Sequence, residues 1–165
     1  MSKLIHLLVA VSVAVPFVEQ FGADNCLPAS VESVDKSFGG NISQYDIRSH
    51  FGGDPNIDML PDADVWTYYC KRSNHTLSWE NSPFRRVGQS LIHMGAGDRV
   101  AITLDTSLGG HSVLLSKVVY QQVTKMNGDS FWRFLYYVTD PARGSNIRIR
   151  ENAIRNALNV FFIVP

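Results

Sequence analysis

The stretch VPFVEQFGADNCLPASVESVDKSFG, residues 15–39, decides the fold because it places one cysteine, Cys26, where a loop meets a helix. Three apolar residues follow at the i, i+3, i+7 spacing of one helical face: Val31, Val34 and Phe38. Pro28 suits the first turn of such a helix, where an N–H has no intrahelical partner. The glycine pair at 39–40 supplies a left-handed stop. The sequence therefore predicts a helix that begins close to Cys26.

This position suits a reactive thiol. The N-terminus of a helix carries partial positive charge, which favours the thiolate, and the thiolate is the nucleophilic form of cysteine. The alternative is structural, because a free cysteine more often packs as a small buried hydrophobe. Cys70 falls inside another predicted helix and is expected to pack in that way. Two cysteines could form one disulfide or remain two free thiols. If Cys26 is a nucleophile, a permanent disulfide is excluded.

Three further polar residues lie at positions where they could assist such a nucleophile. Gln20 lies six positions before Cys26, where its amide could donate to an oxyanion beside the Cys26 N–H. His111 follows two glycines and opens an apolar run, so a strand would hold it rigidly as a base. Asp140 ends another strand-like run and could orient the histidine, although an Asp-Pro pair also commonly serves only to end a strand.

The second half of the chain has the composition of a sheet. β-Branched and aromatic residues dominate four runs, at 99–104, 112–120, 131–139 and 160–164. Asn127-Gly128 lies between the second and third runs and is a strong hairpin signal, so those strands should be antiparallel neighbours. His111 begins one of them and Asp140 ends the other. The predicted hairpin therefore brings these two side chains to the same end of adjacent strands.

The first half is predicted to be helical. Beyond the helix at Cys26, we expect a helix at 43–50 with Ser43 as N-cap and another from an Asp62 cap to about Lys71. A further helix is expected to begin at Ser82-Pro83 and to stop at the glycine-rich stretch 95–97. A short helix is expected at 151–158, and the polar stretch 71–81 is expected to be a loop. The sequence thus predicts an α+β fold, with a helical half carrying Cys26 packed on an antiparallel sheet carrying His111 and Asp140.

At 165 residues, with 45% hydrophobic and 18% charged residues, the chain fits one globular domain, residues 1–165. Residues 1–14 are ambiguous. The apolar run after Lys3 resembles a short secretory signal cut near Ala14, which would make the protein secreted or exported, and it is too short to span a membrane. The alternative is that residues 7–18 form a buried lead-in strand.

Charge and motifs exclude several partners. The 15 basic and 15 acidic residues cancel, and no basic cluster is present that would bind nucleic acid. His6, His50, His75 and His93 have no spacing that makes metal ligands of them, so neither a metal nor a cofactor is expected. The expected partner is a peptide or protein substrate, and the oligomeric state is left open.

In its ordered motifs the sequence resembles the papain-like cysteine peptidases, from about Val15 to the C-terminus. Gln20 and Cys26 are followed by Gly110-His111-Ser112-Val113 and then by Asp140-Pro141. Within this superfamily the chain most resembles the bacteriocin-leader-processing peptidases and the secreted papain-like effector proteases of bacterial pathogens. The resemblance implies Cys26 as nucleophile, His111 as base, Asp140 as orienting group and Gln20 as oxyanion donor.

One departure from this pattern concerns the substrate. Leu27 follows the nucleophile where many relatives carry Trp or Gly, so the wall of the cleft differs. The leading hypothesis is a cysteine peptidase. Two alternatives are an amidase or deamidase that acts on peptidoglycan or protein glutamine, and a papain-like module that binds a partner without catalysis.

Overall fold

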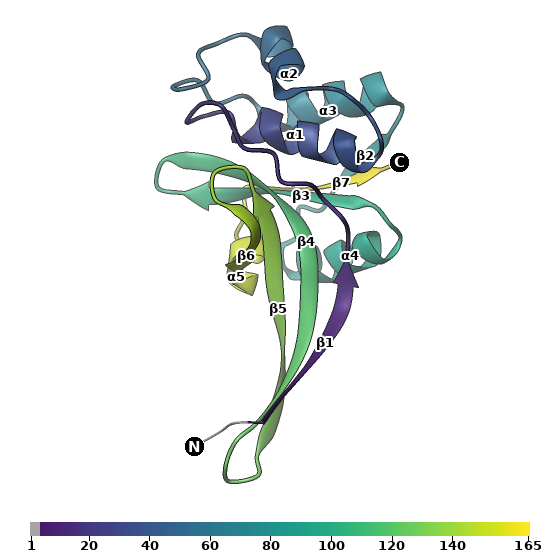
Figure 1. Cartoon of the computed structure of the whole chain (residues 1–165), viewed down its shortest axis with the longest axis vertical. Coiled ribbons are helices and arrows are strands. Elements are labelled where there is room, and N and C mark those ends of the chain that lie inside the picture. Colours follow the sequence, from purple (N-terminus) through teal and green to yellow (C-terminus); the bar gives the residue numbers. More distant parts are fainter. Residues whose placement is uncertain (1–3) are drawn as a thin grey trace.

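The computed structural model describes residues 4–165, and within them the chain forms seven strands and five helices (Figure 1). The helices are α1 (Cys26–Ser37), α2 (Gln44–Phe51), α3 (Asp62–Ser73), α4 (Pro83–Gly95) and α5 (Glu151–Arg155). The strands are β1 (Leu4–Ser12), β2 (Thr76–Trp79), β3 (Arg99–Thr106), β4 (Gly109–Thr124), β5 (Ser130–Asp140), β6 (Gly144–Ile149) and β7 (Asn159–Val164).

All seven strands belong to one antiparallel sheet. Six of them follow the order β2-β7-β3-β4-β5-β6, and β1 pairs with the far half of β4. Strand β4 is the longest and is hydrogen-bonded to β3, β5 and β1. The predicted hairpin is confirmed, since β4 and β5 are antiparallel neighbours joined by a turn in which Gly128 has φ of 87°.

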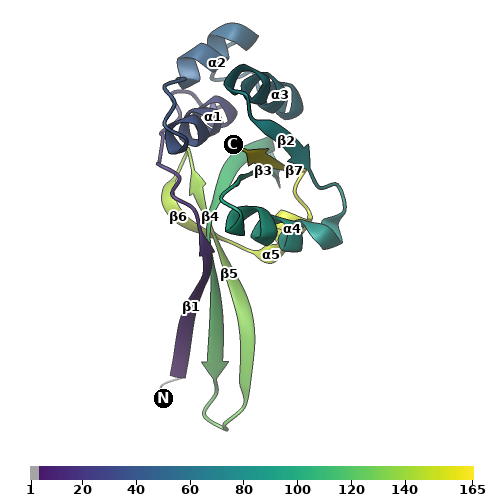
Figure 2. The ribbon, with the colours of Figure 1, turned by 90° about the vertical axis from the view of Figure 1, so that its right-hand side faces the viewer.

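Helices cover both faces of the central sheet, so the body of the protein has three layers (Figures 1 and 2). Successive residues of a strand point to opposite faces. In β3, Ala101 packs with α1–α3, whereas Val100 and Ile102 pack with α4 and α5. Two apolar cores result, and the core under α1 joins the helical half of the chain to the strand that carries His111.

The predicted helices form close to their expected bounds. Helix α1 begins at Cys26, and its C-terminal end is followed by Gly39 with φ of 82°. Ser43 is the N-cap of α2, where it accepts a hydrogen bond from the Asp46 N–H and the Asp46 carboxylate accepts one from the Ser43 N–H. This capping box satisfies two N–H groups that a helix end leaves free.

Three expectations about local structure were wrong. The stretch 71–81 is not a loop, because α3 continues to Ser73 and β2 then pairs with β7. Asp62 is not the cap of α3 but its first helical residue, after Pro61. Strand β6 was not predicted, and α5 ends at Arg155. The two missed strands are short and lie at the edges of the sheet, where sequence patterns are weak.

The N-terminal strand projects from the body. With the far half of β4 and the near half of β5 it makes a long arm (Figures 1 and 2). The expected buried lead-in strand was wrong, because β1 starts at Leu4 and its apolar side chains are exposed, with Leu7 at 61%. Removal of residues 1–14 as a signal stays a prediction, and the first three of them lie outside the described residues. None of the helices described within 4–165 combines the length and apolarity that crossing a membrane requires.

Candidate active site

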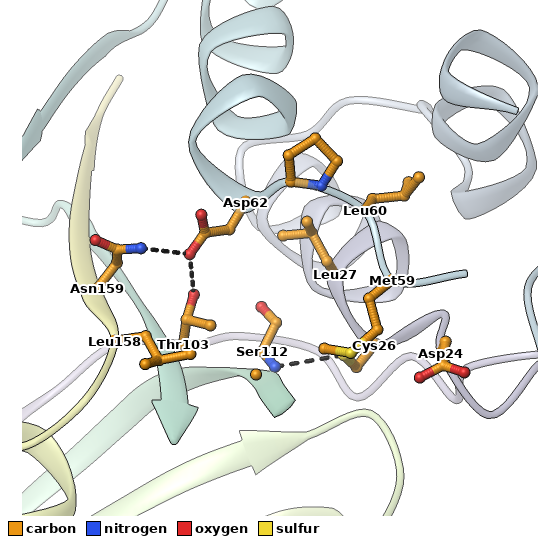
Figure 3. Close-up of a pocket in the computed structure, with 12 residues that line it drawn as sticks. Asp24, Cys26, Leu27, Met59, Leu60, Asp62, Thr103, Ser112, Leu158 and Asn159 are labelled. Atoms are coloured by element: carbon orange, nitrogen blue, oxygen red, sulfur yellow. Dashed lines mark hydrogen bonds between the residues drawn. The ribbon is translucent and has the colours of Figure 1, made fainter. Parts of the chain in front are cut away.

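The thiol of Cys26 lies where α1 meets the central strand β4. Cys26 is the first residue of α1 and is 7% exposed, and its Sγ accepts a hydrogen bond from the Ser112 N–H at 3.4 Å (Figure 3). One turn further along α1, the Ser30 hydroxyl donates to the Ser112 carbonyl at 3.3 Å. The first turn of the helix is therefore fixed to the strand residue that follows His111.

His111 and Asp140 form the pair that the hairpin predicted. The His111 Nε2 lies 2.8 Å from the Asp140 Oδ1, and Asp140 is 4% exposed. The same Oδ1 accepts a hydrogen bond from the Ala142 N–H at 2.9 Å, which holds the carboxylate in place. With Nε2 engaged by Asp140, Nδ1 is the ring nitrogen left for the thiol.

His111 and Asp140 shift each other's pKa values in the directions that favour their charged forms. Hydrogen bonds to Asp140 and then to Cys26 raise the pKa of His111 to about 10, although burial acts in the opposite direction. Burial raises the pKa of Asp140, but the hydrogen bonds from His111 and the Ala142 N–H outweigh it, so this pKa lies below its usual value. Since the folded-state pKa of His111 lies above 6.5, its imidazolium stabilises the fold fully below pH 6.5 and loses that effect as the pH rises towards 10.

Cys70 lies in different surroundings from Cys26, inside α3 rather than at the start of a helix. Both cysteines are free. Cys70 is 3% exposed within α3, and burial raises the pKa of its thiol to about 12. It is therefore a packing residue, as expected, and a natural internal control for the chemistry of Cys26.

Gln20 lies beside the Asp140-Pro141 turn, and its side chain is engaged with its own loop. Its N–H donates to the Pro141 carbonyl at 3.1 Å, which places the segment next to Asp140. Its side-chain nitrogen donates to the carbonyls of Gly22 at 2.7 Å and Ala23 at 3.0 Å. Both amide hydrogens are thus occupied, so an oxyanion would have to replace one of these bonds. The oxyanion role of Gln20 stays a prediction.

A buried polar network beneath Cys26 was not predicted. Asn25, immediately before Cys26, is fully buried, donates to the Gln44 Oε1 at 2.8 Å and accepts from the Arg48 Nε at 2.9 Å. Gln44 also accepts a hydrogen bond from the Phe21 N–H and donates to the Glu19 carbonyl. These contacts join α2 to the whole loop that precedes Cys26.

Arg48 is the centre of this network. It is 6% exposed, and its guanidinium also donates to the carbonyls of Asp24, Gly52 and Asp58 at 3.0 to 3.2 Å. It therefore ties the loop before Cys26 to the loop at 52–58. One sequence signal could have revealed it: Gln44, Ile47 and Arg48 share the i, i+3, i+4 spacing of the buried face of α2.

Two hollows open beside Cys26, on either side of Met59. One has a volume of about 210 Å³ and the other, which reaches His111, about 300 Å³. Met59 crosses the cleft towards β4, since a Cβ on Gly109 would lie 2.9 Å from the Met59 Sδ. Gly109 has φ of 109°, so its backbone conformation favours glycine.

Similarity to a solved structure supports the fold. The chain superimposes on the peptidase domain of Streptococcus ComA, a bi-functional ABC transporter involved in a quorum sensing pathway, with a TM-score of 0.63. The match covers 92% of this chain and 99% of that domain at 14% identity. No protein-family model and no curated protein matches the sequence. The predicted papain-like α+β fold is thus confirmed, whereas the more specific resemblances stay predictions.

The first prediction concerns Asp140. If it orients His111 and stabilises the imidazolium, Asp140→Asn should lower the pKa of His111, because the bond to Asp140 is the largest cause of its elevation. The alkaline limb of the kcat/KM profile should then move to lower pH. Asp129→Asn, in the exposed β4–β5 turn, is the matched control. A profile that superimposes on the wild type would assign Asp140 to the turn alone.

The second prediction concerns Arg48. Arg48→Met would leave the buried Asn25 Oδ1 without its Arg48 donor, at about 1–3 kcal/mol for a buried unsatisfied group, and would remove the bonds to two partly buried carbonyls, so urea denaturation should show a loss of stability. Arg48→Lys keeps the charge but not the planar guanidinium, so its stability should lie between those of the wild type and Arg48→Met. Under conditions where both variants are folded, kcat should still fall. Arg72→Met, an exposed arginine on α3, should change neither quantity. Equal stability in the Arg48 and Arg72 variants would contradict the role of this network.

Proposed function

We propose that this protein is a cysteine peptidase that hydrolyses peptide bonds. Cys26 acts as the nucleophile, His111 as the base that takes its proton, and Asp140 as the residue that orients the imidazole. Gln20 contributes an oxyanion donor together with the Cys26 N–H. The observation that supports the proposal most strongly is the 2.8 Å hydrogen bond between His111 and Asp140. Together with the nearby Cys26, this bond raises the pKa of His111 to about 10.

The proposed reaction follows from these groups. The Cys26 thiolate attacks the carbonyl carbon of the substrate, and the carbonyl π electrons move to its oxygen, which donors beside Cys26 stabilise. When the tetrahedral intermediate collapses, the C–N bond breaks and the His111 imidazolium gives its proton to the leaving amine. Water, deprotonated by His111, then attacks the thioester, and Cys26 leaves as the thiolate.

The fold favours a peptide substrate, since the similar ComA domain is described as a peptidase. An amidase or deamidase would use the same nucleophile and base, so the substrate has to be tested directly. A non-catalytic binding module would not need the linked thiol, imidazole and carboxylate.

The third prediction tests the proposal as a whole. The purified protein should cleave members of a peptide library, and Cys26→Ala should abolish cleavage while remaining folded, because loss of one small side chain costs only about 1–2 kcal/mol. Cys70→Ala is the matched control and should retain activity once folded. A protein glutamine donor and purified peptidoglycan should be assayed in parallel. Turnover of either substrate without peptide cleavage would show that the protein is an amidase or deamidase rather than a peptidase. Full peptidase activity in Cys26→Ala would refute the assignment of Cys26 as nucleophile.

The fourth prediction concerns Gln20. An oxyanion donor acts mainly in the transition state, so Gln20→Ala should lower kcat by about 10²–10³ with little change in KM. Gln122→Ala, on the projecting arm, is the control and should be without effect. An unchanged kcat would leave Gln20 as a residue that only shapes its loop through the Gly22 and Ala23 carbonyls.

A further inference from the structure

The hollow of about 210 Å³ beside Cys26 has an apolar wall and a polar end (Figure 3). Leu27, Leu60 and Leu158 contribute aliphatic side chains to its wall. Asp62 and Ser112 contribute polar groups. A cavity of this size holds one large side chain, since an apolar cavity of about 150 Å³ already accommodates a benzene molecule.

The lining of this hollow is acidic. It contains two carboxylates, Asp24 and Asp62, and no lysine, arginine or histidine, although the chain as a whole carries equal numbers of acidic and basic residues. Arg48 donates to the main-chain carbonyl of Asp24, so a cation lies behind that residue. Asp62 is different, because among residues 4–165 no cationic side chain forms an ion pair with it.

Asp62 is held in place by neutral donors. Its Oδ2 accepts hydrogen bonds from the Thr103 hydroxyl at 2.7 Å and the Asn159 amide at 2.8 Å, and its Oδ1 accepts one from the Ala63 N–H at 2.7 Å. A carboxylate offers about four acceptor sites, so one is left for a ligand. The position at the start of α3 favours a negative side chain. The carboxylate is therefore fixed in place, and it retains capacity to bind a donor.

Ser112 adds a second polar group to the same hollow. It is 3% exposed, and its hydroxyl oxygen is buried without any hydrogen-bond partner, although its N–H and carbonyl are both engaged by α1. Leaving a buried hydroxyl unpaired is energetically unfavourable. A ligand group in the hollow would remove that cost.

We infer that this hollow binds a lysine or arginine side chain of the substrate, close to the scissile bond, with Asp62 as the residue that determines this specificity. The inference rests on the proposed function and names its substrate class. The methylene stem of a basic side chain would pack on the leucines while the charged head donates to Asp62 and Ser112. A leucine side chain would pack on the leucines but would desolvate the Asp62 carboxylate and leave the Ser112 hydroxyl unpaired. A glutamate would be repelled by Asp62.

Covalent labelling tests this inference without requiring hydrolysis. A set of short peptides with a Michael acceptor in place of the scissile carbonyl would carry lysine, arginine, norleucine or glutamate at each of the two positions nearest the electrophile. Intact-mass spectrometry would give the rate of Cys26 labelling, with Cys26→Ala as blank. At one of the positions, lysine and arginine should react about 10- to 100-fold faster than norleucine, the factor expected for a hydrogen bond to a charged group, and glutamate should be slowest.

The variant Asp62→Asn keeps the shape of the side chain and removes its charge. It should reduce the lysine-to-norleucine ratio to near one and leave norleucine labelling unchanged. Asp64→Asn, exposed and two residues further along α3, is the matched control and should retain the wild-type ratio. Circular dichroism would verify that both variants are folded. Equal rates for lysine and norleucine in the wild type, or a lysine preference that survives in Asp62→Asn, would overturn the inference.

The outcomes also separate this inference from the proposed function. Selective labelling by basic probes, without cleavage of any peptide, would refute the peptidase and leave the specificity of the hollow standing. Cleavage of peptides without preference for a basic residue would support the peptidase and refute the proposed specificity of the hollow. Failure of every probe to label Cys26 would contradict the reactive thiol on which both depend.

Discussion

The attachment of α1 to β4 at Ser112 is the constraint on which the site depends. Through its N–H and its carbonyl, this one strand residue holds both Cys26 and Ser30 of the helix. Because β4 is bonded to strands on both sides, the helix is anchored to the most rigid part of the sheet. Cys26 from the first half of the chain and His111 from the second half then line the same hollow.

The loop before Cys26 is fixed by polar rather than apolar contacts. Asn25 and Arg48 are both buried, and their hydrogen bonds connect α2 with the loop before Cys26 and the loop at 52–58. A satisfied buried network is directional, so it specifies one arrangement of the backbone more narrowly than apolar packing does. Loops that carry functional groups benefit from that precision, because small displacements of a nucleophile have large effects on rate.

Two buried or partly buried aspartates show how their neighbours define their roles. Asp140 contacts His111, and the resulting pair raises one pKa and lowers the other. Asp62 contacts only neutral donors, Thr103 and Asn159 among them, so its charge remains available to the adjoining hollow. The two residues have the same side chain, yet one is suited to support catalysis and the other to select a substrate.

The sequence by itself determined the local elements and the order of the catalytic candidates. Periodicity and stop signals located α1 and α4, and the Asn127-Gly128 turn placed His111 beside Asp140, because a hairpin fixes its own register. Only the tertiary structure decided that 76–79 is a strand and that Asp62 faces the hollow beside Cys26. It alone also revealed the contacts of Arg48. Each of these features depends on partners distant along the chain, and periodicity indicates which face of an element is buried but not what buries it.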